Sequence, residues 1–170
     1  SKKPPLQNQG FKWWEHVTEI WAVATNTYIE GTFPNGVQYD MASAIQLMHN
    51  MMVVHAKAVI AYKEAGYEGD GIVHSLESKY PYDETKDEDV KAAKNEDVLN
   101  NQFLLDATFL GKYRDETMEI INRLVELNNG SFHASKDDME ILKEAASYND
   151  YLGINYYQSR FIRYYDCLLY

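Results

Sequence analysis

Residues 149–157 read Asn149-Asp-Tyr-Leu-Gly-Ile-Asn155-Tyr-Tyr157, and this stretch decides the fold class that the sequence predicts. A polar, helical pattern precedes it, and apolar or aromatic residues with one glycine surround a single asparagine. Such a short apolar run predicts a buried strand. Strands that alternate with helices belong to parallel sheets, and in parallel barrels the carboxyl ends of the strands carry the chemistry. We therefore expect Asn155 and Tyr157 to lie at the functional end of a parallel strand.

Helical and extended patterns alternate on the amino-terminal side of this stretch. Apolar residues recur at three- and four-residue steps over residues 40–65, which predicts a long amphipathic helix with Asp40 as its N-cap and Gly66 after its end. No linker divides the chain, so we expect a single α/β domain over residues 1–170. The other expected segments are an extended loop at 1–10, strands near 13–20 and at 71–76, helices at 21–29, 87–100 continuing into 102–110, 115–128 and 136–147, and a loop through 80–82.

Length and charge limit the function classes. The chain has 170 residues, which suits one ordinary domain but is fewer than the roughly 250 of a complete (β/α)8 barrel. The hydrophobic share of 45% is that of a folded protein. A formal net charge of −10 argues against nucleic acid and against anionic membrane surfaces as partners.

Cysteine content and the first residues bear on location. The one cysteine, Cys167, excludes an internal disulfide and favours a reducing compartment. No apolar segment follows Ser1-Lys-Lys-Pro-Pro5, so these residues do not predict a secretory signal. No run reaches the roughly 20 apolar residues of a membrane span. We therefore expect a cytoplasmic protein.

The histidines do not have the spacing of metal ligands. His49 and His55 are six residues apart, which places them on different faces of a helix and gives no i,i+4 pair. We expect no metal and no cofactor. His74 lies in an expected strand, and we interpret it as a partly buried histidine with a hydrogen-bond partner.

Motifs spread along the whole chain occur in a fixed order. They are Pro5-Leu-Gln-Asn-Gln-Gly10, Lys12-Trp-Trp14 through Glu19-Ile-Trp21, Tyr28-Ile-Glu-Gly-Thr-Phe-Pro34, Val73-His74 through Lys79-Tyr-Pro-Tyr-Asp83, Phe103-Leu-Leu-Asp-Ala-Thr-Phe-Leu-Gly111 and the stretch at 149–157. Together they resemble the central third of the family-1 glycoside hydrolases, the retaining β-glycosidases, and most of all the 6-phospho-β-galactosidase (or 6-phospho-β-glucosidase) branch. The resemblance implies a partial (β/α)8 TIM barrel that is helix-rich, with about three barrel strands between the third-strand loop and the sixth strand.

By this resemblance the chain is related to enzymes that hydrolyse 6-phospho-β-galactosides, with Glu19 as the acid/base carboxyl. Such an acid must hold its proton near neutral pH, which apolar neighbours such as Trp14 and Ile20 favour. The family pattern Thr-Phe-Asn-Glu is replaced here by His16-Val-Thr-Glu19, so Thr18 stands at the place of the asparagine. The implied substrate-binding residues are Asn155, Tyr157, Trp21 and Thr18.

Retaining glycosidases also need a second carboxylate, the nucleophile, about 5–5.5 Å from the first. In the family that residue lies on the seventh strand, and the phosphate-binding loop follows the eighth, whereas this chain ends soon after the sixth. We therefore expect the chain to be inactive alone. Glu77 and Asp83, after the fifth strand, are the replacement nucleophiles that the sequence offers.

The alternative is a non-catalytic folded fragment that self-associates, because a partial barrel leaves sheet edges and an inner face open. In that interpretation Glu19 is a solvated carboxylate, and Tyr157 is a core aromatic residue whose hydroxyl binds water. A sugar-binding module built on Asn155, Tyr157 and the tryptophans is a third interpretation. Fold does not by itself grant function, so the sequence leaves these interpretations open.

Overall fold

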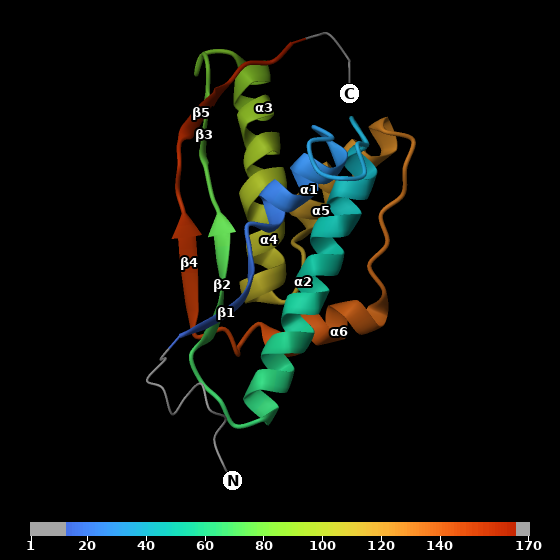
Figure 1. Ribbon diagram of the computed structural model, residues 1–170. Coiled ribbons are helices and arrows are strands. Elements are labelled where there is room, and N and C mark those ends of the chain that lie inside the picture. The colour runs from blue at the N-terminus through green and yellow to red at the C-terminus, as the bar shows by residue number, and fades with distance from the viewer. Residues whose placement is uncertain (1–12, 166–170) are drawn as a thin grey trace.

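The computed structural model describes residues 13–165 (Figure 1). Three parallel strands form a sheet in the order β1-β2-β4, with β1 at Trp14–Thr18, β2 at Asp70–Ser75 and β4 at Tyr151–Asn155. Helices connect successive strands, as parallel pairing requires. The expected α/β class with about three barrel strands is confirmed. The expected loop at residues 1–10, and Cys167, lie outside the described residues.

The helices gather on one side of the strands (Figure 1) and bury an apolar core between themselves and the sheet. Ile45, Met48 and Met52 on the long helix are completely buried, which confirms the predicted core stripe. No helix among residues 13–165 is long and apolar enough to cross a membrane. The helices are α1 (Ile20–Tyr28), α2 (Met41–Glu64), α3 (Asp87–Asp97), α4 (Phe103–Leu105), α5 (Asp115–Leu127) and α6 (Lys136–Ala145), with π-helical turns η2 (Val98–Gln102) and η3 (Asp106–Leu110).

The ends of α2 follow the predicted signals. The side chain of Asp40 accepts a hydrogen bond of 2.9 Å from the Ser43 amide, so it satisfies one of the free N–H groups of the first turn. Gly66 follows the helix with a φ of 84°, a left-handed conformation that costs glycine little. The Asp40 cap therefore marks the start of the helix, and Gly66 marks its end, as predicted.

A second parallel sheet joins β3 (Ser78–Pro81) and β5 (Ser159–Ile162). In Figure 1 these strands continue the paths of β2 and β4. The predicted loop through residues 80–82 was therefore wrong for Tyr80 and Pro81, and β5 was missed. Polar residues and a proline give β3 a weak strand pattern, and the pairing depends on the neighbouring segment, which local sequence does not report.

Close packing on the open face of the sheet requires two glycines. The Tyr151 ring lies over Gly71, where an added Cβ would be 2.6 Å from Cδ1 of the ring. The Tyr151 hydroxyl then donates a hydrogen bond of 2.9 Å to the Trp14 carbonyl, so one side chain from β4 crosses β2 to reach β1. Likewise, a Cβ on Gly153 would be 2.5 Å from Cγ2 of Val73. Because these two positions have no side chain, the Tyr151 and Val73 side chains can pack directly on the neighbouring strand, which a larger residue would prevent.

Candidate active site

Glu19 lies between the end of β1 and the start of α1, at the carboxyl edge of the sheet. Its amide donates a hydrogen bond of 3.0 Å to the Val73 carbonyl, which extends the pairing of β1 with β2 by one residue. Its backbone then turns into the left-handed region, with φ 52° and ψ 44°. Few residues other than glycine adopt this conformation, and such strain clusters at functional sites.

The predicted residues Glu19, Asn155 and Tyr157 meet at this edge. The Asn155 amide nitrogen Nδ2 donates to Glu19 Oε1 at 2.6 Å. The Tyr157 hydroxyl donates to the same oxygen at 2.5 Å. The hydrogen bond from Tyr157 to the Glu19 carboxyl raises the pKa of the phenol. Two donors from the carboxyl end of β4 thus hold one oxygen of a carboxyl group that follows β1.

Asn155 is rigidly placed because it is the last residue of β4, where it pairs with Ser75 of β2. Its carbonyl also accepts a hydrogen bond of 3.2 Å from the Leu76 amide. Tyr157 follows two residues later and is 70% exposed. The interpretation of Tyr157 as a core aromatic residue was therefore wrong, since its ring is largely in solvent and its hydroxyl contacts Glu19.

The other two predicted substrate-binding residues take different positions. Thr18 is exposed at the end of β1, in register with Val73. Trp21 packs against the core and lines a pocket of about 360 Å³ between α1, α3, α5 and the start of α2. Within residues 13–165 neither side chain is hydrogen-bonded to Glu19. Their assignment to substrate binding stays a prediction.

Glu77, one of the replacement nucleophiles, has its carboxylate occupied by neighbours. Lys79 Nζ lies 2.6 Å from Oε2 and Arg160 Nε lies 2.8 Å from it, and Gln158 Nε2 donates to Oε1 at 3.1 Å. Burial opposes the charge, but the hydrogen bonds from Lys79 and Gln158 prevail and hold the pKa of Glu77 below its usual value. This carboxylate joins β3 to β5, and its oxygens are not free to attack a sugar.

Asp83, the second replacement nucleophile, fixes a turn before α3. Its Oδ1 accepts from the Thr85 hydroxyl at 2.7 Å and from the Thr85 amide at 3.0 Å. These hydrogen bonds, with the nearby Lys86 ammonium, lower the pKa of Asp83. The carboxylate is the acceptor of an Asx-type turn.

Sequence reasoning missed the π-helical turn η2, which supports the carboxyl end of β2. Asn100 Nδ2 donates to the Ser75 carbonyl at 3.3 Å. Asn101 Nδ2 donates to the Glu77 carbonyl at 2.7 Å, and its Oδ1 accepts from the Glu77 amide at 3.2 Å. A wider helical turn presents two successive asparagines to one strand end, and π turns are frequent at functional sites. The only sequence signal was the Asn-Asn pair inside an otherwise apolar helical pattern.

Two of the histidines, His49 and His74, are buried. His74 is fully buried and its Nε2 lies 2.9 Å from the Thr108 hydroxyl. His49 Nδ1 lies 2.8 Å from the Tyr113 hydroxyl. No group of three or more possible ligands for a metal ion occurs in the part of the chain that the structure describes.

Parallel strands joined by helices, with a carboxyl group on a strained turn at their carboxyl edge, are the arrangement of enzymes built on (β/α)8 barrels. The chain belongs to glycosyl hydrolase family 1, which it matches over residues 7–168. The predicted family is confirmed.

Curated relatives of the chain are 6-phospho-β-galactosidases. The protein from Staphylococcus haemolyticus (strain JCSC1435) is 48% identical over 155 residues, which is 91% of this chain and 33% of that protein. The protein from Staphylococcus aureus (strain JH9) is 46% identical over 156 residues, again 91% of this chain and 33% of the relative. The chain therefore spans about a third of the length of these relatives.

Solved structures with the same arrangement are β-glucosidases. The enzyme from Exiguobacterium antarcticum B7 has a TM-score of 0.78 and 25% identity, covering 94% of this chain and 34% of its own. The psychrophilic enzyme from Micrococcus antarcticus has a TM-score of 0.75 and 25% identity, covering 91% of this chain and 31% of its own. The described fold is thus about one third of a family-1 barrel.

Proposed function

We propose that this chain carries the acid/base carboxyl of a retaining 6-phospho-β-galactosidase, that Glu19 is that group, and that the chain does not hydrolyse substrate alone. The observation that supports this most is the convergence of Asn155 and Tyr157 on Glu19 Oε1. A structural carboxylate needs no left-handed backbone at the carboxyl edge of a parallel sheet. The substrate class is supported by the names of the Staphylococcus relatives.

Inactivity of the isolated chain follows from the two-carboxyl requirement. A retaining glycosidase needs a nucleophile about 5–5.5 Å from the acid. Glu77 and Asp83 are both engaged in hydrogen bonds of their own. We expect the purified chain to release no product from a chromogenic β-galactoside 6-phosphate, and turnover above buffer would contradict this part of the proposal.

A chimera tests the role of Glu19 directly. Residues 13–165 would replace the matching segment of the S. haemolyticus 6-phospho-β-galactosidase, which supplies the remaining strands. In an active chimera, Glu19→Gln should lower kcat about 10²–10⁴-fold, the usual contribution of a general acid or base. Glu15→Gln is the matched control, because Glu15 is an exposed glutamate on the same strand. Equal kcat values for the two variants would remove Glu19 from the mechanism.

The second candidate function is a non-catalytic chain that self-associates. The observation in its favour is that β1 and β4 each pair only with β2 within the described residues, so both edges of that sheet are open. Light scattering should then give a mass above 19.7 kDa that rises with concentration. A single monomer mass at all concentrations would count against self-association.

A further inference from the structure

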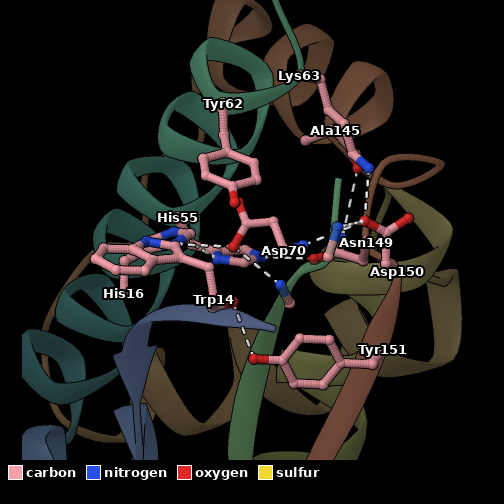
Figure 2. Close-up of polar contacts among 12 residues, drawn as sticks. Trp14, His16, His55, Tyr62, Lys63, Asp70, Ala145, Asn149, Asp150 and Tyr151 are labelled. Carbon is pink, nitrogen blue, oxygen red and sulfur yellow. Dashed lines mark hydrogen bonds and ion pairs between the residues drawn. The ribbon is translucent and has the colours of Figure 1, made fainter. Parts of the chain in front are cut away.

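A second polar cluster, shown in Figure 2, lies near the starts of β2 and β4, whereas Glu19 follows the end of β1. It joins His16 on β1, Asp70 at the start of β2, His55 on α2 and Asn149 just before β4. His55 and Asp70 are at most 1% exposed, and the His16 side chain is 17% exposed. We call these four residues the β1 clasp, since they connect the edge strand β1 to three other elements.

The orientation of Asn149 fixes the tautomer of His55. The amide nitrogen of Asn149 donates to the Thr108 carbonyl at 3.1 Å, so its oxygen Oδ1 faces His55. His55 Nε2 lies 2.9 Å from that oxygen and must carry the proton that it donates. A neutral imidazole has one N–H, so Nδ1 of His55 is an acceptor. Burial lowers the pKa of His55 to about 4, which agrees with a neutral ring.

The same reasoning gives His16 two ring protons. His16 Nε2 lies 3.0 Å from the acceptor Nδ1 of His55, so it must donate. His16 Nδ1 lies 3.2 Å from Asp70 Oδ1, an acceptor, so it must donate as well. A ring with both nitrogens protonated is an imidazolium. The hydrogen bond with Asp70 raises the pKa of His16 despite its burial.

Other charged groups near the clasp leave this assignment intact. Glu15, the neighbour of His16 on β1, adds negative charge that also favours the imidazolium. Asp150 accepts from the Asp70 amide at 3.1 Å, and Lys63 lies 2.6 Å from the same oxygen and compensates its charge. The His16 cation opposes protonation of His55, and His55 in turn opposes protonation of His74 behind β2, so both buried rings stay neutral beside the imidazolium.

We infer that the β1 clasp holds β1, and with it Glu19, in place only while His16 carries both ring protons. If His16 loses either proton, a lone pair faces the Asp70 carboxylate or the His55 lone pair. Reversing the His55 tautomer moves the conflict to Asn149, whose rotation would break its bond to the Thr108 carbonyl. Every arrangement with one proton fewer therefore leaves two acceptors face to face, which costs free energy in a buried site.

The strand geometry carries this effect to the candidate active site. His16 lies on the edge strand β1, three residues before Glu19, which directly follows that strand, and β1 pairs only with β2 in the described part of the chain. The Glu19 amide, bonded to the Val73 carbonyl at 3.0 Å, reports the integrity of that pairing. Raising the pH through the His16 titration should thus loosen β1. The inference does not depend on the proposed glycosidase function.

Nuclear magnetic resonance of the histidine rings tests the proton assignment in the unmodified chain. At pH 7 the ¹⁵N and ¹H signals should show two N–H groups on His16 and one, on Nε2, for His55. Spectra of His16→Gln and His55→Gln assign the rings. A neutral His16 at pH 7, or a His55 that carries its proton on Nδ1, would overturn the inference.

Hydrogen exchange tests the coupling to Glu19. After division by the intrinsic exchange rate, protection of the Glu19 amide should fall about tenfold or more as pH rises through the His16 titration, the equivalent of one charge-assisted hydrogen bond. His16→Gln should lower protection at neutral pH and abolish that step. His133→Gln, at an exposed histidine, should leave the step unchanged. Protection of Glu19 that is independent of pH in the unmodified chain would refute the coupling.

Discussion

At the scale of single residues, Glu19 combines a strained backbone with two donors on one oxygen. The left-handed conformation of a residue other than glycine costs on the order of 1–3 kcal/mol and persists only when its surroundings impose it. Here the Val73 carbonyl holds the amide while Asn155 and Tyr157 hold the side chain. Glu19 is therefore held both at its backbone and at one oxygen of its carboxyl group, which positions the carboxyl as a reacting group requires.

Tyr157 provides a direct test of this contact. Because its hydroxyl donates to Glu19, ionising the phenol would place two negative groups together, and the pKa of Tyr157 is raised above its usual value. In Glu19→Gln that pKa should fall toward the ordinary value of about 10, measured by NMR or ultraviolet titration. Glu15→Gln should leave it in place. An unchanged Tyr157 titration in Glu19→Gln would mean that the two side chains do not meet in solution.

At the scale of elements, the strands and helices that local patterns specify were predicted well. The N-cap of α2 and the apolar run of β4 are properties of contiguous residues, so the sequence reports them. The meeting of Glu19 with Asn155 and Tyr157 followed from the family resemblance. The β3–β5 pairing and the π turn η2 were missed, because both depend on contacts with residues distant in sequence, such as Glu77 with Arg160.

Packing on the open face of the sheet, the face turned away from the helices, gives a prediction at this scale. In Gly71→Ala the new Cβ would lie 2.6 Å from the Tyr151 ring and 2.6 Å from the Tyr151 carbonyl oxygen, closer than non-bonded atoms approach. We expect a loss of about 1–3 kcal/mol in the free energy of unfolding, the usual cost of overpacking, measured by urea denaturation. Adding Tyr151→Ala should recover part of that loss. Fully additive losses in the double variant would show that the ring contributes nothing to the clash and that the Tyr151 carbonyl oxygen alone causes it.

At the scale of the whole molecule, buried neutral histidines link the fold to acid pH. Burial lowers the pKa of His55 and of His74 to about 4, against about 6.5 in an unfolded chain. The folded state thus binds fewer protons than the unfolded state between these values. The stability that these two neutral histidines contribute is fully present above about pH 6.5 and is lost as pH falls toward 4. The raised pKa of His16 acts in the opposite direction, so its contribution is lost as pH rises.

Urea unfolding at pH 7 and pH 5 measures this loss of stability. Both pH values lie above the range in which most carboxyl groups titrate, so the histidines dominate the change. By pH 5, His55 and His74 should each have removed up to roughly 2 kcal/mol of stability, from the gap between the folded and unfolded pKa values of each ring. His74→Gln should lower stability at pH 7, because the bond to Thr108 is altered, and should also reduce the dependence on pH. His133→Gln, at an exposed position, should leave that dependence unchanged. Equal free energies of unfolding at the two pH values would mean that these rings are not buried neutral in solution, and that the helical layer behind the sheet is more open to water than its contacts indicate.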